Sequence, residues 1–188
     1  MAGSLPGRRG FALAALVAAS AVAAGCETTP LEGELPRARP AIDLRGSDFA
    51  DGGELLSEHT CEGAGKSPGL EWSGVPEGTA ELALLMIDLD ADEGRLVHWS
   101  VFAIPPQITD LESGVTPAAI KLGTTSFGRL SYEPACPPTD DGPHRYLFVL
   151  YALSDSLDLP EGASAVELVD AIDRLAKARG SVEAEVDL

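Results

Sequence analysis

Basic residues are scarce in this chain of 188 residues, which has 13 lysines and arginines against 30 aspartates and glutamates. The formal net charge is −17, whereas nucleic-acid binding requires a basic surface that neutralises phosphates. We therefore expect no nucleic-acid partner. The same charge repels an anionic bilayer, so membrane association would have to come from a separate anchor.

Spacings typical of metal sites and of serine hydrolases are also missing. The three histidines and three cysteines form no His-x-x-x-His or Cys-x-x-Cys pattern, and no serine lies in a Gly-x-Ser-x-Gly elbow. Two aspartates and two histidines could still ligate a divalent metal and activate water, which keeps a metal-dependent hydrolase as an alternative. We expect no metal, no cofactor and no enzymatic activity.

One long apolar run is present, and it lies near the N-terminus. Two arginines precede apolar residues 11–24, and the run closes on Ala23-Ala24-Gly25-Cys26. A short run after basic residues is typical of a secretory signal, and small residues before a cysteine indicate a lipobox with lipid on Cys26. An ordinary signal peptide with an incidental cysteine is the alternative. The sequence predicts a signal peptide at residues 1–25 and a lipoprotein of the bacterial cell envelope, anchored outside the cytoplasm.

The remaining chain divides into a short linker and one domain. Residues 26–40 contain three prolines, three acids and no apolar periodicity, which predicts a flexible tether behind the lipidated Cys26. Residues 41–188 have the length of a single domain and contain no internal repeat. We expect one folded unit over residues 41–188.

Three short apolar runs predict the buried strands at the centre of this domain. They cover residues 80–88, 97–104 and 145–153, and proline and glycine turns separate them. Continuous apolar runs of this length are typical of strands buried on both faces. The spacing therefore favours an antiparallel β core.

The C-terminal part changes to helical spacing. Ser164 and Glu167 form a capping box before apolar residues spaced at helical intervals up to residue 176. Gly180 is expected to end this helix. Residues 182–188 then alternate apolar and polar, which predicts a final amphipathic strand.

Polar side chains gather at the ends of the predicted strands. Asp88 and Asp90 share one side if their strand continues, His98 begins an apolar strand, and His144 and Tyr146 share a face. Neighbouring carboxylates repel unless a cation, a hydroxyl or a protonated histidine lies between them. Singly, each of these residues could be structural, as acids that cap a turn or as a hydrogen-bonded core histidine. Together they predict a small polar pocket.

Cys61 and Cys136 remain after Cys26 is set aside. An even number of cysteines in an exported domain favours a disulfide between them. Two separate free thiols are the alternative.

Five motifs occur in order along the domain: His59-Thr60-Cys61-Glu62-Gly63 with Ser67-Pro68, Leu70-Glu71-Trp72-Ser73-Gly74-Val75-Pro76-Glu77-Gly78, Asp88-x-Asp90-Ala91, His98-Trp99, and Cys136-Pro137-Pro138 through Gly142-Pro143-His144-Arg145-Tyr146. With these motifs the chain resembles the phosphatidylethanolamine-binding protein family, in particular its bacterial branch of Raf-kinase-inhibitor-like proteins. The resemblance implies a mostly β fold, an antiparallel β-sandwich of Greek-key type with peripheral helices that include one near the C-terminus.

The resemblance also implies a small pocket for phosphate or phosphoethanolamine-type groups. The ligand-binding residues carried over by motif are Asp88, Asp90, His98, Cys136, Pro138, His144 and Tyr146. Histidine and tyrosine donors could hold phosphate oxygens while carboxylates accept from an ammonium group. Leu89 and Asp92 stand where the family usually has prolines, which leaves this loop less constrained and adds a negative charge beside the site.

These observations predict a lipid-anchored binding protein that takes a small phospho-ligand or a phospholipid headgroup and modulates a partner protein. An inhibitor of an extracytoplasmic protease or kinase, acting through surface loops, is the alternative from a different class. The resemblance implies this alternative because relatives in the family inhibit kinases or peptidases. No motif in this chain separates a binding protein from an inhibitor.

Overall fold

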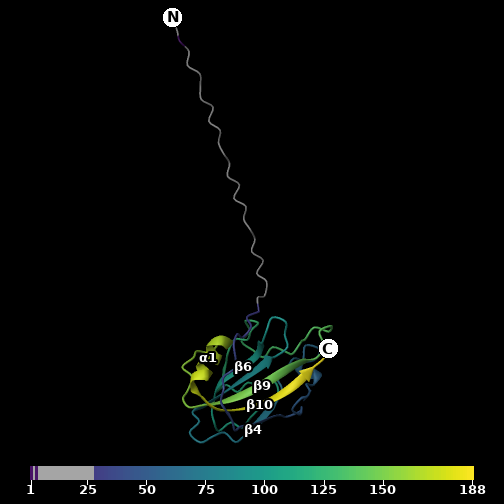
Figure 1. Cartoon of the computed structure of the whole chain (residues 1–188), viewed down its shortest axis with the longest axis vertical. Coiled ribbons are helices and arrows are strands. Elements are labelled where there is room, and N and C mark those ends of the chain that lie inside the picture. The colour runs from purple at the N-terminus through teal and green to yellow at the C-terminus, as the bar shows by residue number, and fades with distance from the viewer. Residues whose placement is uncertain (2, 4–27) are drawn as a thin grey trace.

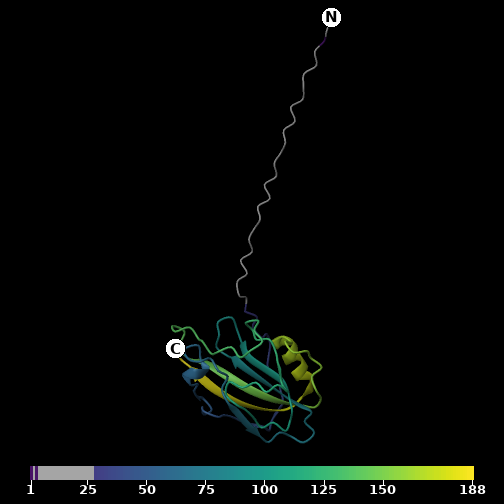
Figure 2. The same cartoon turned by 180° about the vertical axis from the view of Figure 1, so that it is seen from behind.

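The computed structural model describes residues 28–188, together with Met1 and Gly3. Cys26 and nearly all of the predicted signal peptide lie outside the described residues. Figures 1 and 2 show one folded body with a single helix at its side. Among the described residues, no helix is long and apolar enough to cross a membrane.

Ten strands, one α-helix and one 3-10 helix make up the described fold. In chain order they are β1 (Arg39–Pro40), β2 (Asp43–Gly46), β3 (Gly53–Glu54), η1 (Ser57–His59), β4 (Leu70–Ser73), β5 (Glu81–Asp88), β6 (Leu96–Ile104), β7 (Asp110–Leu111), β8 (Lys121–Leu122), β9 (His144–Leu153), α1 (Ala165–Leu175) and β10 (Ala176–Val186). A seven-stranded sheet has the order β1-β10-β9-β5-β6-β8, with β3 also paired to β10. A three-stranded sheet has the order β2-β4-β7.

The three predicted central strands are confirmed as β5, β6 and β9, with bounds within one residue of the apolar runs. β5 pairs antiparallel with β6 on one side and with β9 on the other, and every residue of β5 is buried. β9 reaches β5 by a long return connection, as in Greek-key folds. The predicted mostly β fold with a helix near the C-terminus is confirmed.

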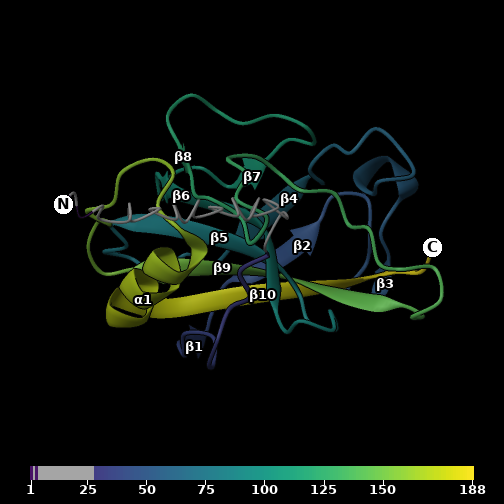
Figure 3. The same ribbon diagram turned by 90° about the horizontal axis from the view of Figure 1, so that it is seen from above.

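Burial on both faces explains why these strands are continuously apolar. On one face, Leu84 of β5 belongs to a hydrophobic cluster with Trp72 of the smaller sheet. On the other face, Leu85 clusters with Leu168 and Ile172 of α1. Figure 3 shows α1 beside the end of the sheet at which β10 begins. The larger sheet is therefore the middle layer, between the smaller sheet and the helix.

The capping box of α1 forms as predicted, but the predicted end of the helix is wrong. The Ser164 hydroxyl accepts from the backbone N–H of Glu167, and the Glu167 side chain accepts from the backbone N–H of Ser164. The helix ends at Leu175, and Gly180 lies inside β10. The Ile42 backbone passes so close to Gly180 that a Cβ there would collide with it. Glycine is needed here for a close approach, which local sequence does not reveal.

The segment predicted as a tether contacts the domain over most of its described length. The buried Leu31 forms a bridge with Arg95, and the hydroxyl of Tyr151 donates to the carbonyl of Pro36. Further on, β1 pairs in parallel with β10. The structure thus packs residues 29–40 against the larger sheet, where sequence analysis expected a free linker. The difference arises because single apolar residues find partners that are distant in sequence.

Candidate functional site

A cavity of about 220 Å³ opens at one end of the central strands of the larger sheet, where β5 ends and where β6 and β9 begin. Because these strands are antiparallel, Asp88 at the end of β5 lies opposite Leu96 on β6 and Tyr146 on β9. Six of the seven predicted ligand residues line this cavity: Asp88, His98, Cys136, Pro138, His144 and Tyr146.

His144 and Asp88 form the charged part of the cavity floor. Nδ1 of His144 lies 2.9 Å from Oδ2 of Asp88, and Nε2 lies 3.2 Å from Oδ2 of Asp141. A neutral imidazole has one N–H, so only the protonated ring donates to both carboxylates. Burial lowers the pKa of His144, but the hydrogen bond and charge of Asp88, followed by those of Asp141, outweigh burial and raise the pKa. The two carboxylates of the floor therefore favour the protonated ring of His144, the imidazolium.

His98 reaches the cavity from an irregularity in β6. Met86 of β5 pairs with Trp99, whereas the next residue, Ile87, pairs with Val97, so His98 is an extra residue on β6. Val97 and Trp99 consequently belong to hydrophobic clusters on opposite faces of the sheet. Such a bulge re-aims the side chain of the extra residue, and here that residue lines the cavity.

The pKa of His98 is shifted in the opposite direction to that of His144. Its Nδ1 lies 3.1 Å from the carbonyl oxygen of Glu133, and a carbonyl can only accept, so Nδ1 carries the proton. Its ring contacts Tyr146 and Phe127 edge-on, with centroid distances of 5.2 and 4.9 Å. Burial lowers the pKa of His98, which favours the neutral ring. The cavity thus combines a histidine whose protonated form is favoured with one whose neutral form is favoured.

Tyr146 lines the cavity, and its hydroxyl is enclosed in the cavity wall. It is buried and has no hydrogen-bond partner among the described residues. Burial raises the pKa of Tyr146, and the charge of Asp88 adds to this effect. Buried hydroxyls are normally hydrogen-bonded, so this one is a candidate donor to a ligand or a water that reaches it from the cavity.

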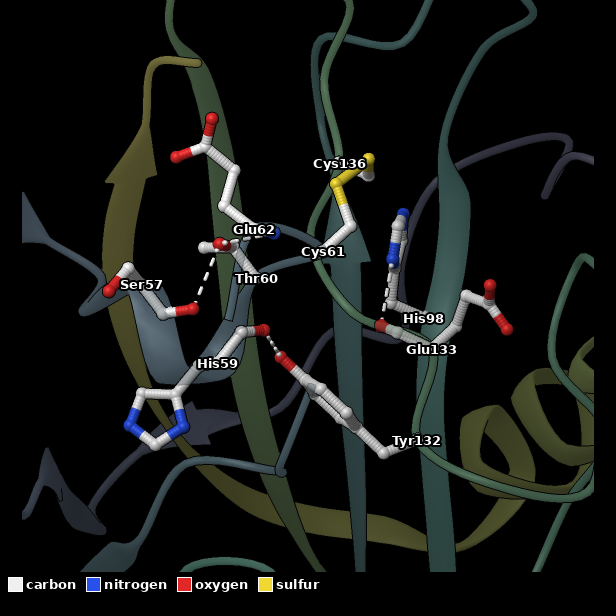
Figure 4. Close-up of a disulfide and its surroundings, with 9 residues drawn as sticks. All are labelled: Ser57, His59, Thr60, Cys61, Glu62, His98, Tyr132, Glu133 and Cys136. Atoms are coloured by element: carbon white, nitrogen blue, oxygen red, sulfur yellow. Dashed lines mark hydrogen bonds between the residues drawn. A yellow bond between two sulfur atoms is a disulfide. The ribbon is translucent and has the colours of Figure 1, made fainter. Parts of the chain in front are cut away.

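The predicted disulfide between Cys61 and Cys136 is present (Figure 4), with Cα atoms 5.4 Å apart, and Cys136 lines the cavity. Nearby, the Tyr132 hydroxyl donates to the carbonyl of His59 at 2.7 Å. The loop before β9 is thereby fastened to the segment that follows η1. This attachment holds Pro138 and its neighbours over the floor.

Asp90 differs from the sequence expectation, because it does not line the cavity. Its carboxylate accepts from the backbone N–H, Nε and Nη2 of Arg145, at 2.8, 2.9 and 2.8 Å. The hydrogen bonds from Arg145 lower the pKa of Asp90. β5 ends at Asp88, so the alternation of faces that would align the two aspartates stops there. Asp90 instead fastens the loop after β5 to the exposed side of β9.

Sequence analysis missed several residues that line the cavity. Exposed Asp92, Glu93 and Asp141 and half-buried Thr28 surround the opening, and we call these four residues the cavity mouth. Phe127 lines the interior beside His98. Asp92 was noted as an added charge, but nothing in the local sequence identifies Thr28 or Phe127, which arrive from distant segments.

The cavity residues do not form a recognisable metal centre. Within the described part of the chain, the one group with closely spaced ligand atoms is Asp48, Glu58 and His59, and none of these lines the cavity. His59 already has a partner at each ring nitrogen, Asp48 at 2.8 Å and the carbonyl of Lys66 at 3.0 Å. The contacts of His59 can therefore serve a structural role without a bound ion.

The strands that line the cavity lie within the part of the chain that matches a known family. A family profile described as phosphatidylethanolamine-binding protein matches residues 45–186. The chain belongs to this family. The predicted resemblance is therefore confirmed over most of the domain.

Curated relatives agree with this assignment. The chain is 41% identical over 138 residues to a UPF0098 protein of Methanothermobacter thermautotrophicus, covering 70% of this chain and 89% of the relative. It is also 41% identical over 145 residues to LppC of Mycobacterium tuberculosis, covering 77% of this chain and 69% of the relative. The name of LppC assigns it, provisionally, to the lipoproteins.

Solved structures agree as well. YbcL of Escherichia coli, described as a new member of the mammalian family, superimposes with a TM-score of 0.74 at 28% identity. The match covers 79% of this chain and 99% of YbcL. A homologue from Chlamydia trachomatis has the same TM-score at 30% identity.

Proposed function

We propose that this family member is an extracytoplasmic binding protein, anchored through lipid on Cys26 in a bacterial cell envelope, whose cavity takes a phosphate or phosphoethanolamine-type group. The observation that carries the proposal is that one cavity is lined by both His144, whose ring faces the Asp88 carboxylate, and Tyr146, whose buried hydroxyl has no hydrogen-bond partner in the part of the chain that the structure describes. The family description supports the ligand class, and the name of LppC supports the anchor.

The lining chemistry suits a ligand with both signs of charge. Phosphate oxygens would accept from the Nε2–H of His144 and from the hydroxyl of Tyr146. An ammonium group would be accepted by the acids of the cavity mouth, Asp92 and Glu93. Because Nε2 of His144 already faces Asp141, an incoming phosphate would replace that carboxylate. The Asp141 side chain is 38% exposed and can rotate into solvent.

The bound state would act through a partner protein rather than through a reaction. None of the relatives described above has a name that describes an enzyme. A filled cavity would alter the loops at its rim, including the stretch around Pro138, and these loops are exposed to partners. The protein would thus report a phospho-ligand at the membrane to another envelope protein.

The test is a two-dimensional NMR titration of residues 27–188 with phosphoethanolamine and, separately, with inorganic phosphate. We expect saturable shifts at Asp88, His98 and His144 with both ligands, and tighter binding of phosphoethanolamine because its ammonium group meets the mouth acids. His144→Ala and Asp88→Asn should weaken both ligands. Absence of saturable shifts at millimolar ligand would refute the phospho-ligand and direct the search to surface partners.

A matched control distinguishes the site from general charge effects. Asp110→Asn removes one carboxylate from β7 in the smaller sheet, outside the cavity lining. We expect it to bind like the unaltered protein. If Asp110→Asn and Asp88→Asn weakened binding equally, the loss would not be specific to the cavity, and the cavity would not be the site.

A further inference from the structure

The N-terminal segment reaches the domain beside the cavity. Thr28 is one of the four mouth residues, and the next residue, Thr29, donates its N–H to the carbonyl of Ser126 at 2.8 Å. Ser126 in turn adjoins Phe127, which lines the cavity. The start of the described chain is therefore held at the mouth.

The same segment is fixed along the whole sheet. Leu31 donates its N–H to the carbonyl of Arg95 at 2.8 Å, and the guanidinium of Arg95 donates to the carbonyl of Gly33 at 2.6 Å. Tyr151 holds Pro36, and β1 pairs with the first residues of β10, at the end of the sheet opposite the cavity. The segment thus runs from the far end of the sheet back to the mouth.

This arrangement sets how far the cavity can be from Cys26. One residue, Glu27, lies between Cys26 and Thr28, and the two steps of chain from Cys26 to Thr28 span about 7 Å at most, whatever their conformation. A free tether over residues 26–40 would span up to about 50 Å and would leave from the opposite end of the sheet. Docking of residues 29–40 therefore removes most of the reach that the tether would have.

We propose that the docked segment holds the cavity mouth against the surface of the membrane that carries the anchor, so that the cavity opens onto lipid headgroups. This inference rests on the lipid anchor at Cys26, which is part of the proposed function. The partner is the bilayer surface itself, reached through Thr28. The docked segment fixes the distance between the cavity mouth and the anchor, whereas a flexible linker would let this distance vary.

The surface around the mouth fits such a partner. Val166 of α1 is 44% exposed and lines a shallow groove with Thr29 and Pro30, which puts apolar surface beside the point where the chain leaves for Cys26. The mouth acids Asp92 and Glu93 repel anionic headgroups and accept from ammonium groups. The surface therefore favours zwitterionic lipid, and anionic lipid at low salt should push the mouth away.

The test measures the distance of the mouth from the bilayer and needs no ligand. The full-length lipoprotein carrying Glu93→Cys is labelled with a fluorophore at that thiol, because Cys61 and Cys136 are already paired. It is reconstituted into vesicles of phosphatidylethanolamine and phosphatidylcholine that contain a lipid with a quencher on its headgroup. Glu77→Cys is the control, since the carbonyl of Glu77 accepts from Lys177 at the start of β10, the end of the sheet opposite the cavity.

We expect strong quenching at position 93 and weak quenching at position 77. A Gly/Ser linker of twelve residues inserted directly before Thr28 leaves every docking contact intact, and it should reduce quenching at position 93 to the level at position 77. Replacing part of the phosphatidylcholine with phosphatidylglycerol should also reduce quenching at position 93, and salt should restore it.

The outcomes separate this inference from the proposed function. Protein that floats with vesicles but shows equal quenching at positions 93 and 77, with or without the linker, would overturn the membrane-facing mouth and leave the anchor standing. Protein that does not float with vesicles lacks the anchor. This outcome would overturn the lipid anchor of the proposed function together with the membrane-facing mouth. The phosphate titration is read independently and decides only the ligand.

Discussion

Oδ2 of Asp88 lies 2.9 Å from Nδ1 of His144, although 56 residues separate them in sequence. The strand register creates this contact: Asp88 pairs with Tyr146, and His144 lies two residues before Tyr146 on the same face of β9. Both side chains are almost fully buried. The last residue of one strand and the first residue of another thus form an ion pair at the cavity floor.

This pair predicts a measurable pKa change. Burial lowers the pKa of His144, and the contributions of Asp88 and Asp141 raise it above the ordinary value of 6.5. Asp88→Asn removes the larger of these two contributions, so the pKa of His144 should fall. NMR titration of the ring protons measures this pKa. Asp110→Asn should leave it unchanged. An unaltered pKa in Asp88→Asn would show that the pair is not ionic.

The same pair predicts how stability depends on pH. A histidine whose pKa is raised by folding stabilises the fold fully below its unfolded pKa of 6.5, and this stabilisation is lost as pH rises through the folded pKa. The unaltered protein should therefore exceed Asp88→Asn in free energy of unfolding by more at about pH 5.5 than at about pH 9. Urea unfolding at both pH values tests this, and a constant difference would contradict it.

Asp141 should compete with a bound anion. Its carboxylate faces Nε2 of His144, where a phosphate oxygen would bind, so Asp141→Ala should tighten phosphate binding by about fivefold, equivalent to about 1 kcal/mol of relieved repulsion. Calorimetry at about pH 5.5 keeps His144 protonated in both proteins. Asp140→Ala removes an adjacent exposed acid that does not line the cavity, and it should change affinity little. Equal effects of the two variants would exclude direct competition.

The disulfide should contribute strongly to stability. Cys61 and Cys136 are 75 residues apart in sequence, and closing a loop of this size lowers the entropy of the unfolded chain. Replacing both cysteines by alanine should reduce the free energy of unfolding by about 4 kcal/mol. Reduction of the unaltered protein with a thiol reagent should give a similar loss. Equal unfolding midpoints with and without reductant would contradict the disulfide.

A buried carboxylate holds the far ends of the central strands. Glu81 of β5 accepts the N–H of Ala103 at 2.8 Å and of Leu157 at 3.1 Å. Ala103 has a φ of 56°, in the left-handed region that non-glycine residues rarely adopt, so this bond also supports an unfavourable backbone conformation.

Glu81→Leu should therefore cost about 3 kcal/mol of unfolding free energy, because it leaves the buried N–H of Leu157 and the half-buried N–H of Ala103 unpaired. Glu81→Gln keeps one acceptor of similar shape and should cost less. Urea unfolding of the two variants gives both values. Equal losses would show that packing, rather than the two hydrogen bonds, determines the contribution of Glu81.

Much of this architecture could be predicted from local sequence. The apolar runs place β5, β6 and β9, and the Ser164–Glu167 capping box places the start of α1, because both depend on residues close together in the chain. The ordered motifs identify the family and six residues that the fold brings to one cavity. That these residues bind a ligand stays a prediction.

Tertiary structure alone decided the remaining features. Gly180 sits in a strand because the Ile42 backbone passes over it, Asp90 turns to Arg145 because β5 ends two residues earlier, and residues 29–40 dock because Leu31 finds a distant hydrophobic cluster. Each outcome depends on contacts between segments separated by many residues. Periodicity and capping signals report only neighbours within about one turn of helix or a few strand positions, so they carry no information about such contacts.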